Sequence, residues 1–401
     1  MSRTMLPSRS AAGSGSIRKV TSTKNGKPYT YWQARYTVGY DPGSGKQIQH
    51  SVAGKTQREV RQKLNQMTYE LDQGTYVAPN KMSLREWMDI WLRDYLNGVK
   101  PSTVFLYKQD VEKYILPRLG AVKLEVLDSV MIQRFYNELL HPNRTNVKPL
   151  APKSVKCIHG VFHRALKKAV EVGYMRSNPT EACELPRLVK PEIKPLEEEQ
   201  VALFLKEIKG HTHEYLYKVA LFTGLRESEI HGLTWDCINF NTGTILVKQQ
   251  LVKGREKGGQ YHMTTPKNGK TRTITAAPTV MELLKAQKAK QVLMRIDAGQ
   301  KWQETNLVFT NAEGGILSYR TTYDCFKRVA TRLGFPDARF HDLRHTYAVA
   351  SIKAGDDIKT VQENLGHATA AFTLDVYGHV TQQMKRDSAN RMEAFISSVL
   401  C

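Results

Sequence analysis

Two short stretches that interrupt regular structure divide the chain of 401 residues into three segments. The first, Gly74 to Ser83, is a short linker. The second, residues 186–195, contains three prolines and forms a stiff, charged linker. A chain of this length is expected to fold as two or three domains. We therefore predict domains at residues 1–80, 81–185 and 186–401.

The first segment has the pattern of a small sheet with one helix. Its first 16 residues, rich in Ser, Gly and Ala with two arginines, are expected to form a flexible basic arm. Strands are predicted at residues 17–20, 29–40 and 47–52, with turns at Asn25-Gly26 and Asp41-Pro42-Gly43, and a helix at 56–71. Residues 1–80 hold 12 Lys and Arg against 4 Asp and Glu. Because strands can enter a groove of duplex DNA, we interpret this segment as a DNA-reading domain; the alternative is a basic domain that binds protein.

The second segment has helical periodicity throughout and predicts an all-α domain. Its apolar faces fall at residues 84–95, 104–116, 131–140 and 155–170, with Pro117 expected to end the second helix and Gly173 the fourth. The aromatic residues at helical spacing are interpreted as core rather than as ligand contacts.

The third segment is predicted to be mainly α-helical with a small antiparallel sheet. Three strands are expected: one at 244–252, a second that ends near Pro266, and a third at 271–275. Asn268-Gly269 is the expected tight hairpin between the second and the third. Helices are expected at 215–222 and, in sequence, over 343–354, 358–365 and 371–376. The whole chain is thus expected to be a multidomain protein: a small α+β domain, an all-α domain and a mainly α domain.

The charge balance narrows the class of partner. The chain carries 59 Lys and Arg against 38 Asp and Glu, a net charge of +21, which favours a polyanion such as nucleic acid. A membrane surface is the alternative. No stretch of 18 apolar residues occurs and the first 16 residues lack a signal-peptide core, so we expect a cytoplasmic, nucleoid-associated protein. The five cysteines form no CxxC pair, so neither a disulfide framework nor a zinc module is expected.

A set of polar residues in the third segment points to phosphate chemistry. One arginine follows a glycine break where a helix begins, in TGLRESEI, and a glutamate one turn later is placed to orient it. A lysine stands at the hairpin tip, and four further residues lie within the stretch from 341 to 377. The candidate catalytic residues are Arg226, Lys267, His341, Arg344, His367 and Tyr377, with Glu229 in support.

These residue types suit the cleavage of a phosphodiester by a tyrosine. Two arginines can bind the non-bridging oxygens and stabilise the charge that builds in the transition state. A tyrosine hydroxyl can attack phosphorus, but its ordinary pKa near ~10 requires help from a base or cation, which His341 is positioned to give. Lys267 would protonate the leaving 5′ oxygen, and His367 would add a hydrogen bond to the phosphate. The arginines supply the positive charge, so no metal is required.

Each of these residues also has an ordinary structural explanation. Arg226 can be a salt-bridge partner of Glu227 or Glu229, and a lone histidine in a helix is most often only packed there. His341 and His345 have the i, i+4 spacing of a zinc pair, but Asp342 stands where such motifs carry glutamate, Arg344 would repel the cation, and no third ligand is apparent. The ordered set, rather than any single residue, carries the interpretation.

The chain resembles the tyrosine recombinases, also called phage-type integrases. The catalytic signature of that family has the same order of residues, namely Arg, Lys, His-x-x-Arg, His and Tyr. The matching segments are TGLRESE, TPKNGKTR, HDLRHTYA, LGH and LDVYGH. Residues 84–185 resemble the core-binding domain of the family and residues 1–80 its arm-binding domain. GSGSIRKV, YWQARYTVGYDPGSGK and NGVKPSTV most resemble integrases of conjugative transposons from Gram-positive bacteria.

The resemblance implies a mechanism and a set of partners. Tyr377 would form a 3′-phosphotyrosyl bond with DNA, and four protomers would bring two DNA sites together and exchange strands through a Holliday junction. The implied DNA partners are the core and arm sites at the element ends and the target DNA. It implies no cofactor and no metal, and makes an excisionase helper plausible. Which lysine of the turn acts, Lys267 or Lys270, stays open. A C-terminal apolar stripe from Met392 to Leu400 would pack on a neighbouring protomer or on the same chain.

Two other functions compete with a recombinase that integrates and excises a mobile element. A type IB-like topoisomerase shares the tyrosine chemistry but needs neither a basic N-terminal sheet nor a C-terminal apolar stripe. A DNA-binding regulator without activity would explain the net charge of +21 but not the ordered set of six residues.

Overall fold

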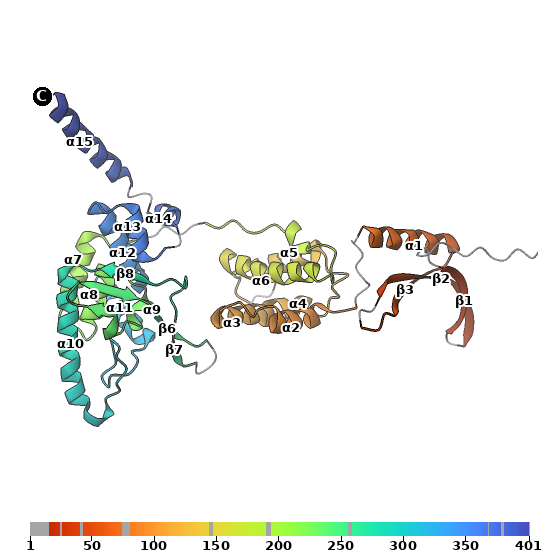
Figure 1. Cartoon of the computed structure of the whole chain (residues 1–401), viewed down its shortest axis with the longest axis horizontal. Coiled ribbons are helices and arrows are strands. Elements are labelled where there is room, and N and C mark those ends of the chain that lie inside the picture. The colour runs from red at the N-terminus through yellow and green to blue at the C-terminus, as the bar shows by residue number, and fades with distance from the viewer. Residues whose placement is uncertain are drawn as a thin grey trace, which may run out of the picture. The chain divides into compact units, whose positions relative to one another are not determined.

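The chain forms two compact units, Met1–Val189 and Lys190–Cys401. The computed structural model describes residues 16–24, 26–40, 43–73, 81–143, 147–189, 194–255, 259–367, 369–377 and 381–400. The predicted fold class is confirmed, with a sheet and helix, a helical bundle, and a mainly helical unit that carries small antiparallel sheets (Figure 1). The predicted domain boundaries stay a prediction.

The N-terminal sheet is antiparallel with the strand order β1-β2-β3. Its elements are β1 Ser16–Lys24, β2 Lys27–Tyr40, β3 Gln47–Gly54 and the helix α1 Gln57–Asp72. Because side chains alternate along a strand, Ala34 and Tyr36 of β2 point toward α1 and pack with Val60 and Leu64. Thr56 caps α1 by accepting a hydrogen bond from the backbone N–H of Glu59. The predicted arm (but for its last residue), Asn25 and the Asp41-Pro42 pair lie outside the described residues.

The helical bundle of the first unit has an aromatic core, as predicted. Its helices are α2 Leu84–Asp94, α3 Pro101–Asp110, α4 Leu116–Leu119, α5 Ser129–Leu140 and α6 Pro152–Glu171. Trp87, Trp91, Tyr136 and Phe162 are all buried there. The indole N–H of Trp87 donates to the carbonyl of Ala165 at 3.0 Å, so the one polar group of that side chain is satisfied in the core.

The prediction that Pro117 ends the second helix of this bundle is wrong. The chain instead passes through a π-helical turn, Val111–Ile115, and continues as α4, with Pro117 near its start. Proline has no N–H to donate, and its ring would clash with the carbonyl four residues earlier in a regular helix. The wider π turn removes that clash, so the helix changes its winding rather than stopping.

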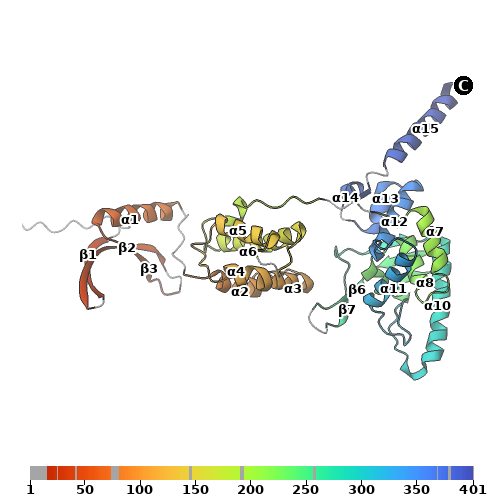
Figure 2. The same cartoon turned by 180° about the vertical axis from the view of Figure 1, so that it is seen from behind.

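The second unit combines helices with two small sheets (Figures 1 and 2). Its helices are α7 Glu198–Glu207, α8 Glu214–Thr223, α9 Glu227–His231, α10 Pro278–Ala298, α11 Tyr319–Arg332, α12 Phe340–Lys353, α13 Ile358–Leu365, α14 Ala370–Tyr377 and α15 Thr381–Leu400. Its strands are β4 Ile238–Asn239, β5 Thr244–Val247, β6 Gln250–Lys253, β7 Tyr261–Thr264 and β8 Arg272–Thr275. The β6-β7 sheet lies at the edge of the unit (Figures 1 and 2). Its core brings together α8, β5, β8, α11 and the start of α12.

The strand pairing of this unit differs from the prediction in two ways. Residues 244–252 do not form one strand, because the chain breaks between β5 and β6. The Asn268-Gly269 turn is present, but it does not join a hairpin: β7 pairs with β6, whereas β8 pairs with β5 in the other sheet. A turn signal is local, whereas strand pairing depends on long-range packing, so the turn type alone did not determine the partners.

In the part of the chain that the structure describes, no helix combines the length and apolarity that crossing a bilayer requires.

A buried histidine in α9 gives this unit a predicted pH dependence. His231 is 1% exposed and lies with its Nδ1 3.1 Å from the carbonyl of Leu317, and burial lowers its pKa to about 4. Below pH ~6.5 the unfolded chain binds a proton that the folded His231 does not, so stability falls as the pH drops from that value toward the folded pKa. We expect His231 to contribute a loss of about 1–2 kcal/mol between pH 7 and pH 5.

Urea unfolding of the full chain at these two pH values measures the loss. His231→Asn should be less stable at pH 7 but should lose less on acidification than the wild type, while the exposed His262→Asn should behave like the wild type. An equal acid loss in His231→Asn and wild type would assign the pH dependence to other groups.

Candidate active site

The site is built where the ends of α8 and α13 meet α12. Gly224 caps α8 in the left-handed conformation, with φ of 62°, and a Cβ there would lie 2.4 Å from Cδ1 of Tyr347 on α12. Gly366 caps α13 in the same conformation, also with φ of 62°. Both positions therefore require glycine, which explains the breaks in TGLR and LGH. In both views of the ribbon, α12, α13 and α14 lie side by side (Figures 1 and 2).

Arg226 is fixed by a glutamate one turn along its own helix. It occupies the N-cap position of α9, where its backbone N–H and its Nη1 donate to the two carboxylate oxygens of Glu229 at 3.0 and 2.7 Å. Its Nη2 donates to the carbonyl of Gly366 at 3.0 Å. Of the two glutamates that the sequence offered as partners, Glu229 is therefore the one used. One carboxylate oxygen of Glu227 is buried without a hydrogen-bond partner, and burial raises the pKa of Glu227 to about 7.

Arg344 lies on α12 and is only 3% exposed. Its Nη1 donates to the carbonyl of Gly224 at 2.7 Å and its Nη2 to the carbonyl of Leu365 at 2.6 Å. Carbonyls at helix C-termini lack intrahelical donors and carry partial negative charge. The guanidinium thus satisfies the ends of two helices at once, and its orientation is set by α8 and α13 together.

His367 follows Gly366 directly and is held from both sides. Its backbone N–H donates to the carbonyl of Gln362, and its Nδ1 lies 2.9 Å from the hydroxyl of Thr373, which is fully buried in α14. Burial and the charges of Arg344 and Arg226 lower the pKa of His367 to about 3. The imidazole is therefore neutral near pH 7 and available for hydrogen bonding to a phosphate.

His341 lies one turn before Arg344 on α12. Desolvation by the surrounding protein, with the charges of His345 and Arg344, lowers the pKa of His341, although its side chain is exposed at the surface. A neutral imidazole is the form that can accept a proton from a nucleophile. The ring centroids of His341 and His345 lie 4.9 Å apart, with the two rings perpendicular. Among the described residues no third His, Cys, Asp or Glu completes a metal-binding group.

The turn that carries the candidate lysines reaches this site. The backbone N–H of Gly269 closes the turn on the carbonyl of Pro266 at 2.8 Å, and the Asn268 side chain donates to the carbonyl of Gly366 at 3.1 Å. Arg226 and Asn268 thus share one acceptor. Lys267 and Lys270 are both exposed on either side of Asn268, so the choice between them stays a prediction.

Tyr377 is the last residue of α14, the helix that begins three residues after His367. Its side chain lies outside the described residues, so its role as nucleophile stays a prediction. The structure brings Arg226, Arg344, His367 and the lysine turn together around residues 364–367, with His341 one helical turn away.

Two residues of this site were not singled out from the sequence. Arg272, at the start of β8, donates from Nη1 and Nη2 to the two oxygens of Glu229 at 2.9 and 2.7 Å, and Asn268 binds Gly366 as described. The sequence assigned no role to Arg272. Its burial, at 11% exposure of the side chain, has no signal in the local sequence.

Comparison with known proteins identifies the family. The pattern that describes the Phage integrase family matches residues 194–384, and that of the phage integrase N-terminal SAM-like domain matches residues 83–140. The chain belongs to the phage integrase family of tyrosine recombinases. It is accordingly a site-specific tyrosine recombinase, and the predicted resemblance is confirmed.

Relatives of this recombinase span nearly its whole length. It is 28% identical to a "Tyrosine recombinase XerC-like" protein of Caldanaerobacter subterraneus subsp. tengcongensis, covering 94% of this chain and 98% of the relative. It is 24% identical to the "ICEBs1 integrase" of Bacillus subtilis, covering 90% and 96%. The second relative agrees with the predicted resemblance to integrases of conjugative elements.

Solved structures share the fold. The Tn1549 transposon integrase in complex with transposon right end DNA superposes with a TM-score of 0.65 at 20% identity, covering 78% of this chain and 100% of that one. A lambda integrase tetramer bound to a Holliday junction gives a TM-score of 0.53 at 20% identity, covering 87% and 96%.

Proposed function

We propose that this recombinase integrates and excises a mobile genetic element by tyrosine-mediated exchange of DNA strands. One observation carries the proposal. The guanidiniums of Arg226 and Arg344 both donate hydrogen bonds to carbonyls of the loop that leads into His367. Positive groups fixed before the substrate arrives stabilise a phosphoryl transition state without reorganisation.

The proposed cleavage conserves bond energy in the protein. The Tyr377 hydroxyl loses its proton to His341 and attacks phosphorus, forming a 3′-phosphotyrosyl bond while the bond to the 5′ oxygen breaks. The turn lysine, Lys267, gives a proton to that oxygen. The 5′ hydroxyl of a second strand then attacks the phosphotyrosine and releases Tyr377. No net redox change or hydrolysis occurs.

Duplex DNA is the proposed substrate, with the first unit as its accessory reader. The face of the N-terminal sheet opposite α1 presents the paired Arg18 and Gln33 of β1 and β2 together with Arg35. Tyr29 and Tyr31 lie on the same face, with ring centroids 5.7 Å apart. A sheet face with cations, an amide and aromatic rings suits a DNA groove. The Tn1549 integrase is described in complex with transposon right end DNA, and the ICEBs1 relative is named an integrase, which supports a mobile-element substrate.

A covalent trapping assay tests the proposed function. The full chain, with EDTA present, is mixed with element ends nicked so that the released fragment diffuses away and religation stops. We expect a denaturation-resistant protein–DNA adduct. DNA binding without an adduct on any end would contradict the proposal and favour a regulator. Supercoil relaxation without exchange between two sites would favour a topoisomerase. An excisionase helper would appear as a protein required for excision but not for integration.

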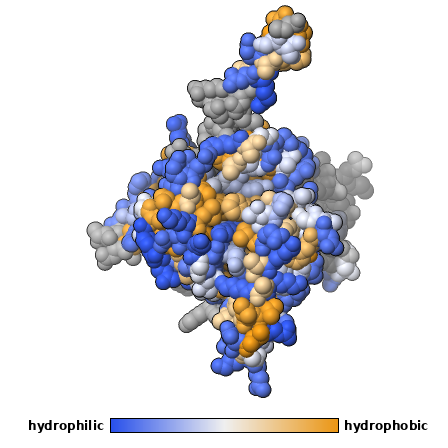
Figure 3. Space-filling view, turned by 90° about the vertical axis from the view of Figure 1, so that its left-hand side faces the viewer, coloured by the Kyte–Doolittle hydropathy of each residue, from blue (hydrophilic) through white to orange (hydrophobic). Residues whose placement is uncertain are grey.

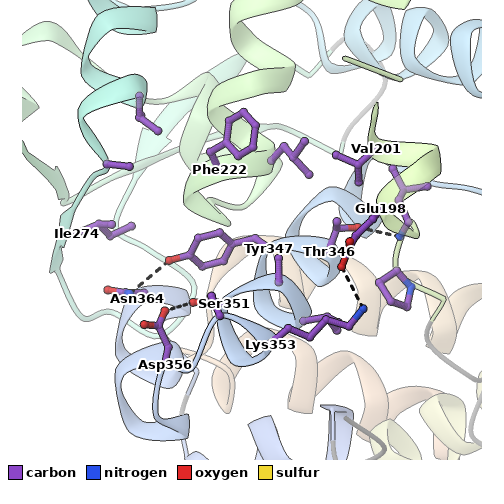
Figure 4. Close-up of a pocket in the computed structure, with 18 of the residues that line it drawn as sticks. Glu198, Val201, Phe222, Ile274, Thr346, Tyr347, Ser351, Lys353, Asp356 and Asn364 are labelled. Carbon is purple, nitrogen blue, oxygen red and sulfur yellow. Dashed lines mark hydrogen bonds and ion pairs between the residues drawn. The ribbon is translucent and has the colours of Figure 1, made fainter. Parts of the chain in front are cut away.

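We further propose that the C-terminal helix of one protomer docks on a neighbour when four protomers assemble on DNA. The apolar side chains of α15 from Met392 to Leu400 are exposed, and Figure 3 shows apolar colour at the end of this helix. An apolar groove of about 1470 Å³ lies between α7, the end of α8, β8 and α12, lined by Val201, Phe222, Ile274 and Tyr347 (Figure 4). Glu197 at its edge offers a negative charge to Arg391 on α15, whereas Glu198 pairs with Lys353 at 3.5 Å.

Phe395→Asp should weaken this assembly. Burying a phenylalanine contributes about 1.5–3 kcal/mol, so we expect at least a tenfold loss in the formation of DNA-bound tetramers in native gels. Binding of one protomer to a half-site should be unchanged. The neighbouring exposed Ser397→Asp is the control. If α15 packs on its own chain instead, Phe395→Asp would leave assembly unchanged and lower the melting temperature of the DNA-free protein.

A further inference from the structure

Arg272 joins segments of the site that lie far apart in the sequence. It begins β8, five residues after Lys267. Its Nη1 and Nη2 bind both oxygens of Glu229, at 2.9 and 2.7 Å, and its Nε donates to the carbonyl of Asn364 at 2.8 Å. It therefore joins the lysine turn, the helix that holds Arg226 and the last turn of α13.

The same guanidinium packs against the glycine that precedes His367. A Cβ on Gly366 would lie 3.1 Å from Cδ and Nη1 of Arg272. The side chain thus fills the space beside the loop whose carbonyls bind Arg226, Asn268 and Arg344. Loss of Arg272 would leave this space open and the carbonyl of Asn364 without its donor.

The Glu229 carboxylate is shared between the two arginines. Its side chain is fully buried and accepts two bonds from Arg272 and two from Arg226. Burial alone would raise the pKa of Glu229, but hydrogen bonds and charge from Arg272, followed by Arg226, lower it to about 2. Without Arg272, half of the bonds that orient this carboxylate are lost, and a buried carboxylate with fewer donors is costly.

We propose that Arg272 is a positioning residue for DNA cleavage: it holds Glu229 and the end of α13 in the places that align Arg226 and His367. This inference rests on the proposed function. Misplacement of a reacting group by about 1 Å can cost ~10²-fold in rate, whereas affinity for a polyanion depends mainly on the number of cations near the phosphates. Arg272 therefore acts on the rate of cleavage and not on the binding of DNA.

The test compares Arg272→Met, Arg272→Lys and the exposed control Arg320→Met, whose arginine pairs only with Asp324 in the described contacts. Adduct formation at saturating DNA gives the cleavage rate, and titration gives the dissociation constant. We expect Arg272→Met to cleave ~10²-fold slower with an affinity within about threefold of the wild type. Arg272→Lys, which keeps the charge but not the bidentate geometry, should be intermediate. The control should equal the wild type.

Two further readouts separate positioning from a general loss of structure. In Arg272→Lys the acid limb of the pH profile of the cleavage rate should move to higher pH. The pKa of Glu229 should rise there, because Arg226 is then the only arginine that still contacts this carboxylate. Combining Arg272→Met with Glu229→Gln should be no slower than the slower single variant, since both act through one arrangement.

The inference would be wrong if Arg272→Met cleaved DNA at the wild-type rate. It would also be wrong if the losses of cleavage rate in Arg272→Met and Glu229→Gln multiplied in the double variant. If Arg272→Met fails to fold, the inference would be overturned by an Arg272→Lys protein that cleaves at the wild-type rate with an unshifted pH profile. Absence of an adduct from the wild type would refute the proposed function and this inference with it, whereas a wild-type rate in Arg272→Met would refute this inference alone.

Discussion

Tyr377→Phe is expected to abolish the covalent protein–DNA adduct, a loss of at least ~10⁴-fold, because the reaction has no other nucleophile of this kind in its ordered set. DNA affinity should stay within about twofold of the wild type, since the change removes one oxygen from the last residue of α14 and no cation. Trapping on nicked ends measures the first quantity and a binding titration without cleavage the second.

Tyr347→Phe is the matched control for this variant. Tyr347 lies in the same unit, packs against Gly224, and its hydroxyl accepts a long hydrogen bond of 3.4 Å from the side chain of Asn364. Its loss should leave adduct formation within a few fold of the wild type. An adduct that persists in Tyr377→Phe would show that another residue attacks phosphorus, and peptide mapping of the DNA-linked fragment would identify it.

The parts of the site that the sequence predicted are those encoded locally. Gly224 and Gly366 end their helices in the left-handed conformation, which glycine adopts readily. Arg226, two residues after Gly224, and His367, directly after Gly366, are placed by that local geometry. Arg344 follows His341 by three positions, so one helix carries both. Local rules of helix capping and periodicity are sufficient for these placements.

The parts that the sequence did not predict depend on contacts between distant segments. Arg272 meets Glu229 across 43 positions and Asn364 across 92, and nothing near Arg272 in the sequence distinguishes it from an exposed turn cation. The partners of β7 and β8 depend on the core in the same way. Contacts within one turn of a helix, such as Glu229 with Arg226, were thus predictable, whereas contacts between distant segments were not.

The acceptor carbonyls explain how this site holds two arginines around one loop. Gly224, Leu365 and Gly366 offer carbonyls at the C-terminal ends of α8 and α13, where the helix dipoles place partial negative charge. Glu229 adds a full negative charge. These groups offset the repulsion between the guanidiniums before DNA binds, so the site is arranged in advance of its substrate.

Arg344→Lys is therefore expected to have a large effect on cleavage. Lysine cannot donate to Gly224 and Leu365 in the fixed geometry of the guanidinium while also presenting a planar edge to a phosphate. We expect the cleavage rate to fall by about 10²–10³-fold, comparable to the loss of one preorganised donor to a developing oxyanion. Stability should also fall by about 1–3 kcal/mol, because a buried carbonyl loses its partner. Trapping kinetics and urea unfolding measure the two effects.

Arg339→Lys separates this effect from a general change of charge on the same helix. Arg339 is the N-cap residue of α12, its side chain is 60% exposed, and it pairs with Asp342 at 2.9 Å. Lysine keeps the positive charge beside Asp342, so this variant should cleave and unfold nearly as the wild type does. If Arg344→Lys cleaved at the wild-type rate, the bidentate arrangement would not be required. Catalysis would then depend on the positive charge at this position and not on its geometry.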